Sequence, residues 1–225
     1  MGEVVTADDR LFIVCDGMGG HDSGEVASRL VCETMRSYIK ERQQPADGRE
    51  RSEVLFQDAL SAAYDALDAA DTGAAKKMGT TLTLALFHAE GCLLAHIGDS
   101  RIYHIRPEGK QMLYKSRDHS LVNNLYELGE ITKEEMKTSP QRNIITRAMQ
   151  PLQERRAKAA VNHTADIKQG DYFYLCTDGM LEDVEDEEIV NIISMNTSSE
   201  EKRRILAARS AEARDNHSAY LVGKN

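Results

Sequence analysis

The chain reads Leu11-Phe12-Ile13-Val14-Cys15-Asp16-Gly17-Met18-Gly19-Gly20, an apolar run that leads into a carboxylate and a glycine-rich turn. A short apolar run that stops at a turn signal predicts a buried strand, here over residues 11–15. The Asp16 carboxylate would then lie at the end of that strand. A charge buried there is costly unless a partner compensates it.

Three further aspartates lie beside apolar runs elsewhere in the chain. They occur in the segments Ile97-Gly98-Asp99-Ser100-Arg101, Thr177-Asp178-Gly179 and Arg214-Asp215-Asn216. An isolated Asp-Gly is most often a turn, but four strand-end aspartates are poorly explained as four separate turns. Converging carboxylates need cations, and Mg²⁺ or Mn²⁺ takes oxygen ligands. The pattern therefore predicts a metal centre and, with it, metal-assisted hydrolysis or phosphoryl transfer.

The composition excludes several classes of protein. The 225 residues carry a formal net charge of −9, and 41% of them are hydrophobic. This length suits one large domain or two small ones. The acidic balance argues against a nucleic-acid partner, which requires a basic face. No run reaches transmembrane length and no signal peptide is visible, so we expect a cytoplasmic protein that does not bind membranes.

The four cysteines fit neither a zinc site nor a redox pair, because no C-x-x-C spacing occurs among Cys15, Cys32, Cys92 and Cys176. Three of them lie inside apolar, strand-like runs and resemble small buried hydrophobic residues. We expect four reduced thiols, as in a cytosolic protein.

Hydrophobic periodicity places helices and strands along the chain. Helices are predicted over residues 22–41, 52–70, 118–137, 185–195 and 199–213, with N-terminal caps at Asp22, Ser52 and Thr132. Strands are predicted over residues 11–15, 79–87, 92–97, 102–106, 112–115, 156–163, 172–176 and 218–222, with Gly170 joining the pair 156–163 and 172–176. Residues 82–87 are small or apolar on both faces, which indicates cover on both. Strands grouped between helix pairs predict two packed sheets with helices outside, an α+β fold.

Six motifs, taken together, resemble those of a known family. They are Asp16-Gly17-Met18-Gly19-Gly20-His21, Gly79-Thr80-Thr81, Gly98-Asp99-Ser100-Arg101, Asp118-His119-Ser120, Thr177-Asp178-Gly179 and Asp215-Asn216. Their order is similar to that of the metal-dependent protein phosphatases of the protein phosphatase 2C type. The Asp-Gly-Met-Gly-Gly form resembles the bacterial branch. The resemblance extends from about residue 11 to residue 222.

The resemblance implies a four-layer αββα sandwich, with two antiparallel sheets flanked by helix pairs, and hydrolysis of phosphoserine and phosphothreonine in proteins. It implies two or three Mn²⁺ or Mg²⁺ ions. Asp16 would bridge two ions, the Gly17 carbonyl would bind the second, and Asp178 and Asp215 would hold the first. Asp99 and Asp178 would bind a third. Residues 118–149 match the segment that varies between family members and bears on substrate choice, here called the flap.

The expected mechanism uses a hydroxide that two metal ions share, which attacks phosphorus in line without a phosphoenzyme. Asp16, Asp178 and Asp215 would be the catalytic residues. Thr80 and Thr81 would form hydrogen bonds behind the ligands. His119 and Ser120 would brace the flap. Arg101 and Arg147 would either contact phosphate or, as we favour, pair with carboxylates. His21 would either protonate the leaving oxygen or, as we favour, be a surface histidine.

The chain departs from the family pattern before Asp16. Family members carry an Arg that grips phosphate and an acidic pair that completes the second metal's shell, and only Glu3 is a candidate substitute for the acid here. We therefore expect a single phosphatase domain over residues 1–225 that lacks the family's first strand and has reduced activity. The alternative is a weakened or inactive phosphatase-like domain that binds a kinase or phosphoprotein. The expected partners are phosphorylated proteins and a cognate serine/threonine kinase, and the expected oligomeric state is a monomer.

Overall fold

Strand β1 (Leu11–Val14) separates two hydrophobic cores in the computed structural model, which describes residues 10–19, 21–73, 77–211 and 215–224. Leu11 and Ile13 belong to one core, and Phe12 and Val14 belong to another. Successive side chains of a strand point to opposite faces of its sheet. A strand that is apolar at every position must therefore be covered on both faces. The same holds for residues 82–87, as predicted.

The strands form two four-stranded antiparallel sheets and a small ribbon. The first sheet has the order β1, β4 (Leu82–His88), β5 (Gly91–Ile97), β8 (Ala160–Thr164). The second has the order β10 (Ala219–Gly223), β9 (Tyr172–Cys176), β6 (Arg101–Arg106), β7 (Gln111–Lys115). The ribbon pairs β2 (Gly17–Met18) with β3 (Gly79–Thr80).

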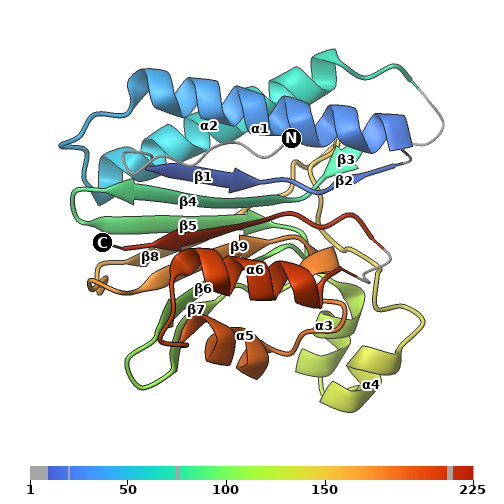
Figure 1. Cartoon of the computed structure of the whole chain (residues 1–225). Coiled ribbons are helices and arrows are strands. Elements are labelled where there is room, and N and C mark those ends of the chain that lie inside the picture. The colour runs from blue at the N-terminus through green and yellow to red at the C-terminus, as the bar shows by residue number, and fades with distance from the viewer. Residues whose placement is uncertain (1–9, 20, 74–76, 212–214, 225) are drawn as a thin grey trace.

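Helices cover the outer faces of both sheets (Figure 1). Helices α1 (His21–Arg42) and α2 (Arg49–Ala69) pack on the first sheet over one core, and α5 (Asp186–Ile193) and α6 (Ser199–Arg209) pack on the second sheet over another. A third core lies between the two sheets. Three stacked cores make four layers, so the predicted αββα sandwich is confirmed.

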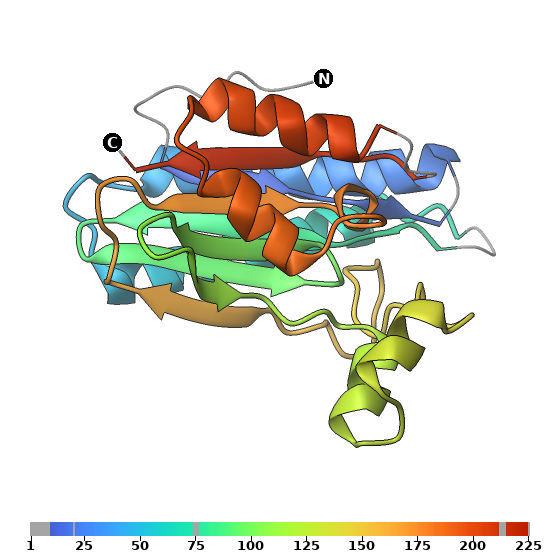
Figure 2. The same ribbon diagram turned by 60° about the horizontal axis from the view of Figure 1, so that its bottom comes forward.

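The flap projects from one end of the sandwich (Figure 2). It contains α3 (Leu121–Glu127) and α4 (Lys133–Thr138). The prediction of one continuous helix over residues 118–137 is wrong, because Gly129 adopts a positive φ of 73° and ends the first helix. The predicted capping box at Thr132 and Glu135 is confirmed and starts the second.

Three other predicted boundaries are wrong. Helix α1 begins at His21, so Asp22 lies within its first turn. Helix α2 begins at Arg49, because the Glu90 carboxylate accepts the Arg49 N–H at 2.9 Å and caps the helix from a distant turn. Strand β8 begins at Ala160 and pairs with β5, whereas β9 pairs with β6 and β10. The two predicted neighbours across Gly170 therefore belong to different sheets.

Ser52 lies inside α2 instead of capping it. Its side chain is fully buried, and its hydroxyl has no hydrogen-bond partner in the described part of the chain. A buried hydroxyl without a partner destabilises a fold, and Ala favours helix more than Ser does. We expect Ser52→Ala to raise the free energy of unfolding by about 1 kcal/mol, measured by urea denaturation. The matched control is Ser28→Ala on α1, where the hydroxyl donates to the Glu25 carbonyl. An equal gain in both variants would contradict the assignment to the buried hydroxyl.

All four cysteines are free thiols. Cys92 and Cys176 are buried in strands, and burial raises the pKa of both thiols. Alkylation of the denatured protein, without a reductant, is expected to modify four sites in mass spectrometry. A native disulfide among them would contradict the prediction of reduced thiols.

None of the helices in the described part of the chain is both long enough and apolar enough to cross a membrane.

Candidate metal centre

The backbone of Asp16 is fixed by two threonines. Its N–H donates to the Thr81 hydroxyl at 3.0 Å. Its carbonyl accepts from the Thr80 hydroxyl and from the Thr81 N–H, both at 2.9 Å. Thr81 also shares a 2.8 Å hydrogen bond with Ser100, the residue after Asp99. The predicted supporting role of Thr80 and Thr81 is therefore confirmed, and Thr81 joins the Asp16 segment to the Asp99 loop.

Gly17 has no room for a side chain. A Cβ on Gly17 would lie 2.1 Å from the carbonyl oxygen of Gly24 on α1, and that oxygen belongs to backbone that cannot rotate away. The glycine allows the first turns of α1 to pack directly against the ribbon strand β2. This contact sets the position of the Gly17 carbonyl.

The carboxyl groups of Asp16 and Asp178 are within hydrogen-bonding reach of one another, and each shifts the pKa of the other. Burial raises the pKa of Asp16 to about 8, together with the charge of Asp178, that hydrogen bond, and the charges of Asp215 and Asp99. Burial also raises the pKa of Asp178, but its hydrogen bond with Asp16 opposes the rise. The two carboxyl groups therefore titrate as a pair.

Asp99 and Asp215 complete the group of carboxylates. Asp99 is buried in the turn between β5 and β6. Burial and the charges of Asp178 and Asp118 raise its pKa to about 7, against the opposing effect of Arg101. Asp215 is exposed, and its charge acts on both Asp16 and Asp178. Charge interactions in the structure thus link the four predicted aspartates.

This donor set fits hard divalent cations. Every donor is an oxygen, and Asp178 Oδ1 is buried and has no hydrogen-bond partner among the described residues. A buried carboxylate oxygen with no donor is costly, and a cation would supply the missing partner. Among the described residues, no three His, Cys, Asp or Glu side chains surround a single point. Mg²⁺ keeps several waters and needs few protein ligands, so a looser group of carboxylates still suits it.

Comparison with known proteins decides the family. Residues 2–214 match the family described as Protein phosphatase 2C. The chain belongs to the protein phosphatase 2C family. A putative protein phosphatase 2C-type of Streptococcus pyogenes is 35% identical over 198 residues, which cover 86% of this chain and 76% of the relative. The protein phosphatase PhpP of Streptococcus pneumoniae is 32% identical over 218 residues, which cover 96% and 86%.

Solved structures agree with this assignment. The serine/threonine phosphatase PstP/Ppp of Mycobacterium tuberculosis superimposes with a TM-score of 0.82 at 29% identity, covering 99% of this chain and 94% of that one. The catalytic domain of PstP in complex with two manganese ions gives a TM-score of 0.72 at 31% identity, covering 97% and 90%. The predicted family is confirmed, and so is the predicted class of enzyme, a phosphoprotein phosphatase.

A cavity of 820 Å³ lies between the flap and the second sheet of this phosphatase. Asp99, Asp178 and Asp215 line it together with both flap helices and the loop over residues 181–185. The flap contributes basic side chains, and the loop contributes acidic ones: Lys133, Lys137 and Arg142 face a cavity that Glu182, Asp183 and Glu185 also line. The cavity thus places Asp99, Asp178 and Asp215 beside the flap.

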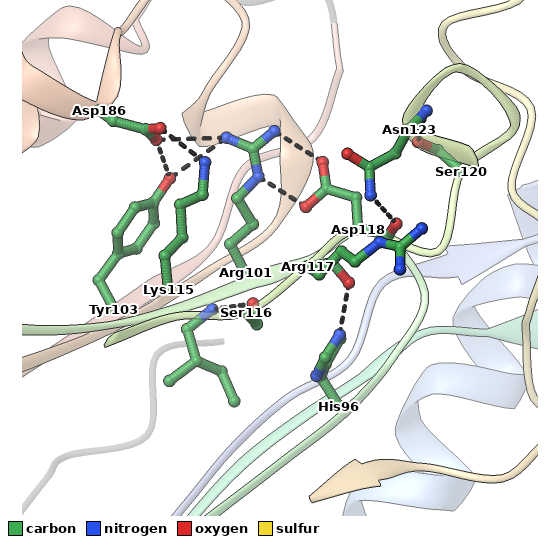
Figure 3. Close-up of polar contacts among 11 residues, drawn as sticks. His96, Arg101, Tyr103, Lys115, Ser116, Arg117, Asp118, Ser120, Asn123 and Asp186 are labelled. Carbon is green, nitrogen blue, oxygen red and sulfur yellow. Dashed lines mark hydrogen bonds and ion pairs between the residues drawn. The ribbon is translucent and has the colours of Figure 1, made fainter. Parts of the chain in front are cut away.

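Most of the contacts predicted where the flap meets the sandwich are present. Arg101 pairs with Asp118 through two hydrogen bonds (Figure 3). The sequence did not identify Asp118 as the partner of Arg101, because the two residues belong to separate motifs. The His119 carbonyl accepts the Thr146 N–H at 2.8 Å, and Ser120 caps α3. Both residues therefore brace the flap.

Other predicted roles are corrected or lie outside the described structure. Arg147 Nη1 lies 3.3 Å from His119 Nε2, and no carboxylate among the described residues pairs with Arg147, so the favoured prediction of a carboxylate partner is wrong for this residue. Its charge acts on both imidazoles of the stacked pair His119 and His96. The side chain of His21 and the whole of Glu3 lie outside the described residues.

Proposed function

We propose that this phosphatase hydrolyses phosphoserine and phosphothreonine in proteins with two or three Mn²⁺ or Mg²⁺ ions. Asp16, the Gly17 carbonyl, Asp99, Asp178 and Asp215 would hold the ions. The observation that carries the proposal is the group of interacting aspartates, in which burial and neighbouring charges raise the pKa of Asp16 to about 8 and Asp178 Oδ1 has no hydrogen-bond partner among the described residues. When bound, such ions lower the pKa of a shared water and neutralise charge on phosphate oxygens.

The chain's own residues prepare this site. Thr80 and Thr81 fix the backbone of Asp16, so its carboxylate needs little reorganisation. The raised pKa values of Asp16 and Asp99 mean that cations displace protons from these carboxyl groups on binding. Metal binding is therefore expected to release protons near neutral pH.

Side chains beside the ligands lack what a nucleophile needs. The Ser100 hydroxyl is buried and hydrogen-bonded to Thr81, and the Thr177 hydroxyl accepts from the Ser218 N–H at 3.1 Å. A hydroxyl nucleophile requires an adjacent base. Burial and the neighbouring His96 and Arg147 lower the pKa of His119 to about 4, so this histidine is neutral. These features support direct hydrolysis without a phosphoenzyme.

The proposal also covers the domain organisation, the partners and the location of the protein. We propose a single domain in which residues 118–149 form the flap, phosphorylated proteins as substrates, a serine/threonine kinase as the functional counterpart, and a cytoplasmic monomer. The acidic composition supports the absence of a nucleic-acid partner. The alternative, a phosphatase-like domain that only binds a kinase or phosphoprotein, has no described feature in its favour.

The test is hydrolysis of a phosphothreonine peptide by the purified chain. Phosphate release is expected with Mn²⁺ and is expected to stop when EDTA is added. Residual activity in EDTA would contradict the metal assignment. No release at millimolar Mn²⁺, by a folded protein that binds the peptide, would favour the binding alternative.

A further inference from the structure

We propose that Cys15 and Cys32 form an oxidation site, at which a peroxide converts their two thiols into a disulfide and so inactivates the candidate metal centre. The effect of this disulfide on hydrolysis rests on the proposed function, whereas its formation does not. The expectation of four reduced thiols applies to the protein before it meets the oxidant.

The two thiols meet between the end of β1 and the middle of α1. Cys15 follows β1 directly, and Cys32 lies within α1. Their thiols are within hydrogen-bonding reach of one another, and both side chains pack against the same hydrophobic core. A disulfide forms without large backbone movement only between cysteines whose side chains already point toward one another. This pair meets that condition.

Access to solvent separates this pair from the other two cysteines. Cys15 and Cys32 are partly exposed, whereas Cys92 and Cys176 are fully buried. Cys92 lies in the core between the two sheets, and Cys176 lies in the core beneath α5 and α6. A dissolved oxidant therefore reaches the first pair, and the two buried thiols belong to separate cores and do not pair with one another.

The oxidation has a balanced course with hydrogen peroxide. The sulfur of one thiolate attacks an oxygen of the peroxide, the O–O bond breaks, and the sulfur becomes a sulfenic acid while the released hydroxide takes up the thiol proton as water. The second sulfur then attacks the first, the S–O bond breaks, and a second water leaves as the S–S bond forms. The two thiols thus lose two electrons and two protons, and one hydrogen peroxide is reduced to two waters.

The pair is expected to stay reduced until the oxidant is in excess. The contact with Cys32, together with burial, raises the pKa of the Cys15 thiol. The thiolate is the form that reacts, so a thiol with a raised pKa reacts slowly. Disulfides in reducing surroundings, where they occur, are mostly transient and sense oxidants. The site therefore suits a reversible response to oxidant and not a permanent cross-link.

Closing the disulfide is expected to move Cys15 more than Cys32. The two sulfurs must approach one another until they form a bond of about 2.05 Å. Cys32 is held by the backbone of the 22-residue helix α1. This helix cannot shift toward the end of β1, because a Cβ on Gly24 would already lie 2.8 Å from the carbonyl carbon of Gly17. Cys15 belongs to no helix or strand, so it is the residue that yields.

A shift of Cys15 is passed to the candidate ligand Asp16, the next residue. The Asp16 N–H donates to the Thr81 hydroxyl at 3.0 Å, and on the other side the Val14 carbonyl accepts from the Thr83 hydroxyl at 3.1 Å. Both neighbours of Cys15 are therefore held, and its displacement strains the bonds that position Asp16. Misplacement of a reacting group by about 1 Å can cost roughly 10²-fold in rate.

The variant Cys32→Ser tests the proposal, with Cys92→Ala as its matched control. Cys92→Ala also removes one thiol, but it leaves the Cys15–Cys32 pair intact. Each protein is treated with hydrogen peroxide in EDTA, and catalase and desalting then remove the peroxide and the chelator. One half of each sample is reduced with dithiothreitol and desalted again. Cysteine linkage is measured by peptide mass spectrometry, Mn²⁺ binding by titration calorimetry, and activity by hydrolysis of a phosphothreonine peptide.

In the unmodified protein and in Cys92→Ala, we expect a peptide in which Cys15 and Cys32 are linked with the loss of two hydrogen atoms. Mn²⁺ affinity and the rate of hydrolysis should each fall roughly tenfold or more, and dithiothreitol should restore both. Cys32→Ser should show neither the linkage nor a loss that dithiothreitol reverses. Dithiothreitol does not reverse methionine oxidation, which is repaired by dedicated reductases, so the recovery distinguishes the disulfide from that damage.

The proposal is overturned if the treated, folded protein contains no Cys15–Cys32 linkage, or if the linked protein binds Mn²⁺ as the untreated protein does. It is also overturned if Cys32→Ser loses and recovers Mn²⁺ binding to the same extent as the unmodified protein. If Cys32→Ser does not fold, Cys32→Ala is judged by the same measurements. If the untreated protein fails to hydrolyse the peptide, the proposed function alone is wrong, because the linkage and Mn²⁺ binding still decide whether the oxidation site exists.

Discussion

Replacing Asp16 with Asn is expected to abolish phosphatase activity and, in the same protein, to stabilise the metal-free fold at pH 8. The loss of activity follows from losing the carboxylate proposed to bridge two cations. Metal-assisted charge stabilisation supplies several kcal/mol, so the rate should fall by roughly 10³-fold or more. Hydrolysis of a phosphothreonine peptide at saturating Mn²⁺ measures this effect.

The gain in stability follows from the sign of the pKa shift. In the metal-free fold, burial and the neighbouring carboxylates raise the pKa of Asp16 to about 8, from an ordinary value of 3.8. Folding therefore favours the protonated form. The associated stability is fully present below pH 4 and is lost as the pH rises through 8. Asparagine stays neutral, so Asp16→Asn should unfold at higher denaturant concentration than the unmodified protein, by roughly 2 kcal/mol at pH 8.

Asp58→Asn is the matched control, because Asp58 is exposed on α2. This substitution removes the same charge and should change neither the rate of peptide hydrolysis nor the stability of the metal-free fold at pH 8. Activity that survives in Asp16→Asn, or a metal-free variant that is less stable than the unmodified protein at pH 8, would show that Asp16 is not a strained metal ligand. Asp178→Asn offers an independent check, since Mn²⁺ binding by calorimetry should weaken sharply.

Replacing Asp171 with Ala is expected to destabilise the fold by about 3–5 kcal/mol at pH 7. Asp171 precedes β9 at the end opposite to Asp178, and solvent reaches only 1% of its surface. Its carboxylate accepts two bonds from Arg106 at 2.9 Å and contacts His104 Nε2 at 3.0 Å. Its removal leaves the buried imidazole of His104 without this partner, and leaves the Arg106 guanidinium with only its contacts to the solvated Asp166. Urea denaturation measures the loss.

This network also predicts an acid-dependent loss of stability. Burial alone would raise the pKa of Asp171, but Arg106, the Lys168 N–H and His104 together lower it to about 2. The associated stability is present above pH 4 and is lost as the pH falls through 2. The difference in stability between the unmodified protein and Asp171→Ala should therefore shrink between pH 4 and pH 2.

Asp166→Ala is the matched control, because Asp166 pairs with the same Arg106 from a side chain that is 68% exposed. A solvated pair contributes little, so this variant should change stability only slightly. Equal losses of unfolding free energy in the two variants would show that burial does not determine how strongly the Asp171 contacts stabilise the fold.

The sequence alone determined the strand ends that carry the aspartates and the number of layers in the fold. Both depend on local pattern. Leu11 to Val14 are apolar on both faces of one strand, which requires cover on both sides whatever the rest of the chain does. The position of a carboxylate after such a run follows from chain order. The family was predicted because the order of six motifs is similar to that in protein phosphatase 2C enzymes.

Only the tertiary structure decided which groups meet. Helix α2 begins at Arg49 because Glu90 caps it from the β4–β5 turn, and Arg101 is held by Asp118 and Asp186, which lie far from it along the chain. Contacts of this kind depend on packing and leave no local signal. The pKa of Asp16 is likewise a property of the assembled site, because burial and the charges of Asp178, Asp215 and Asp99 act on it only after strands from distant parts of the chain converge.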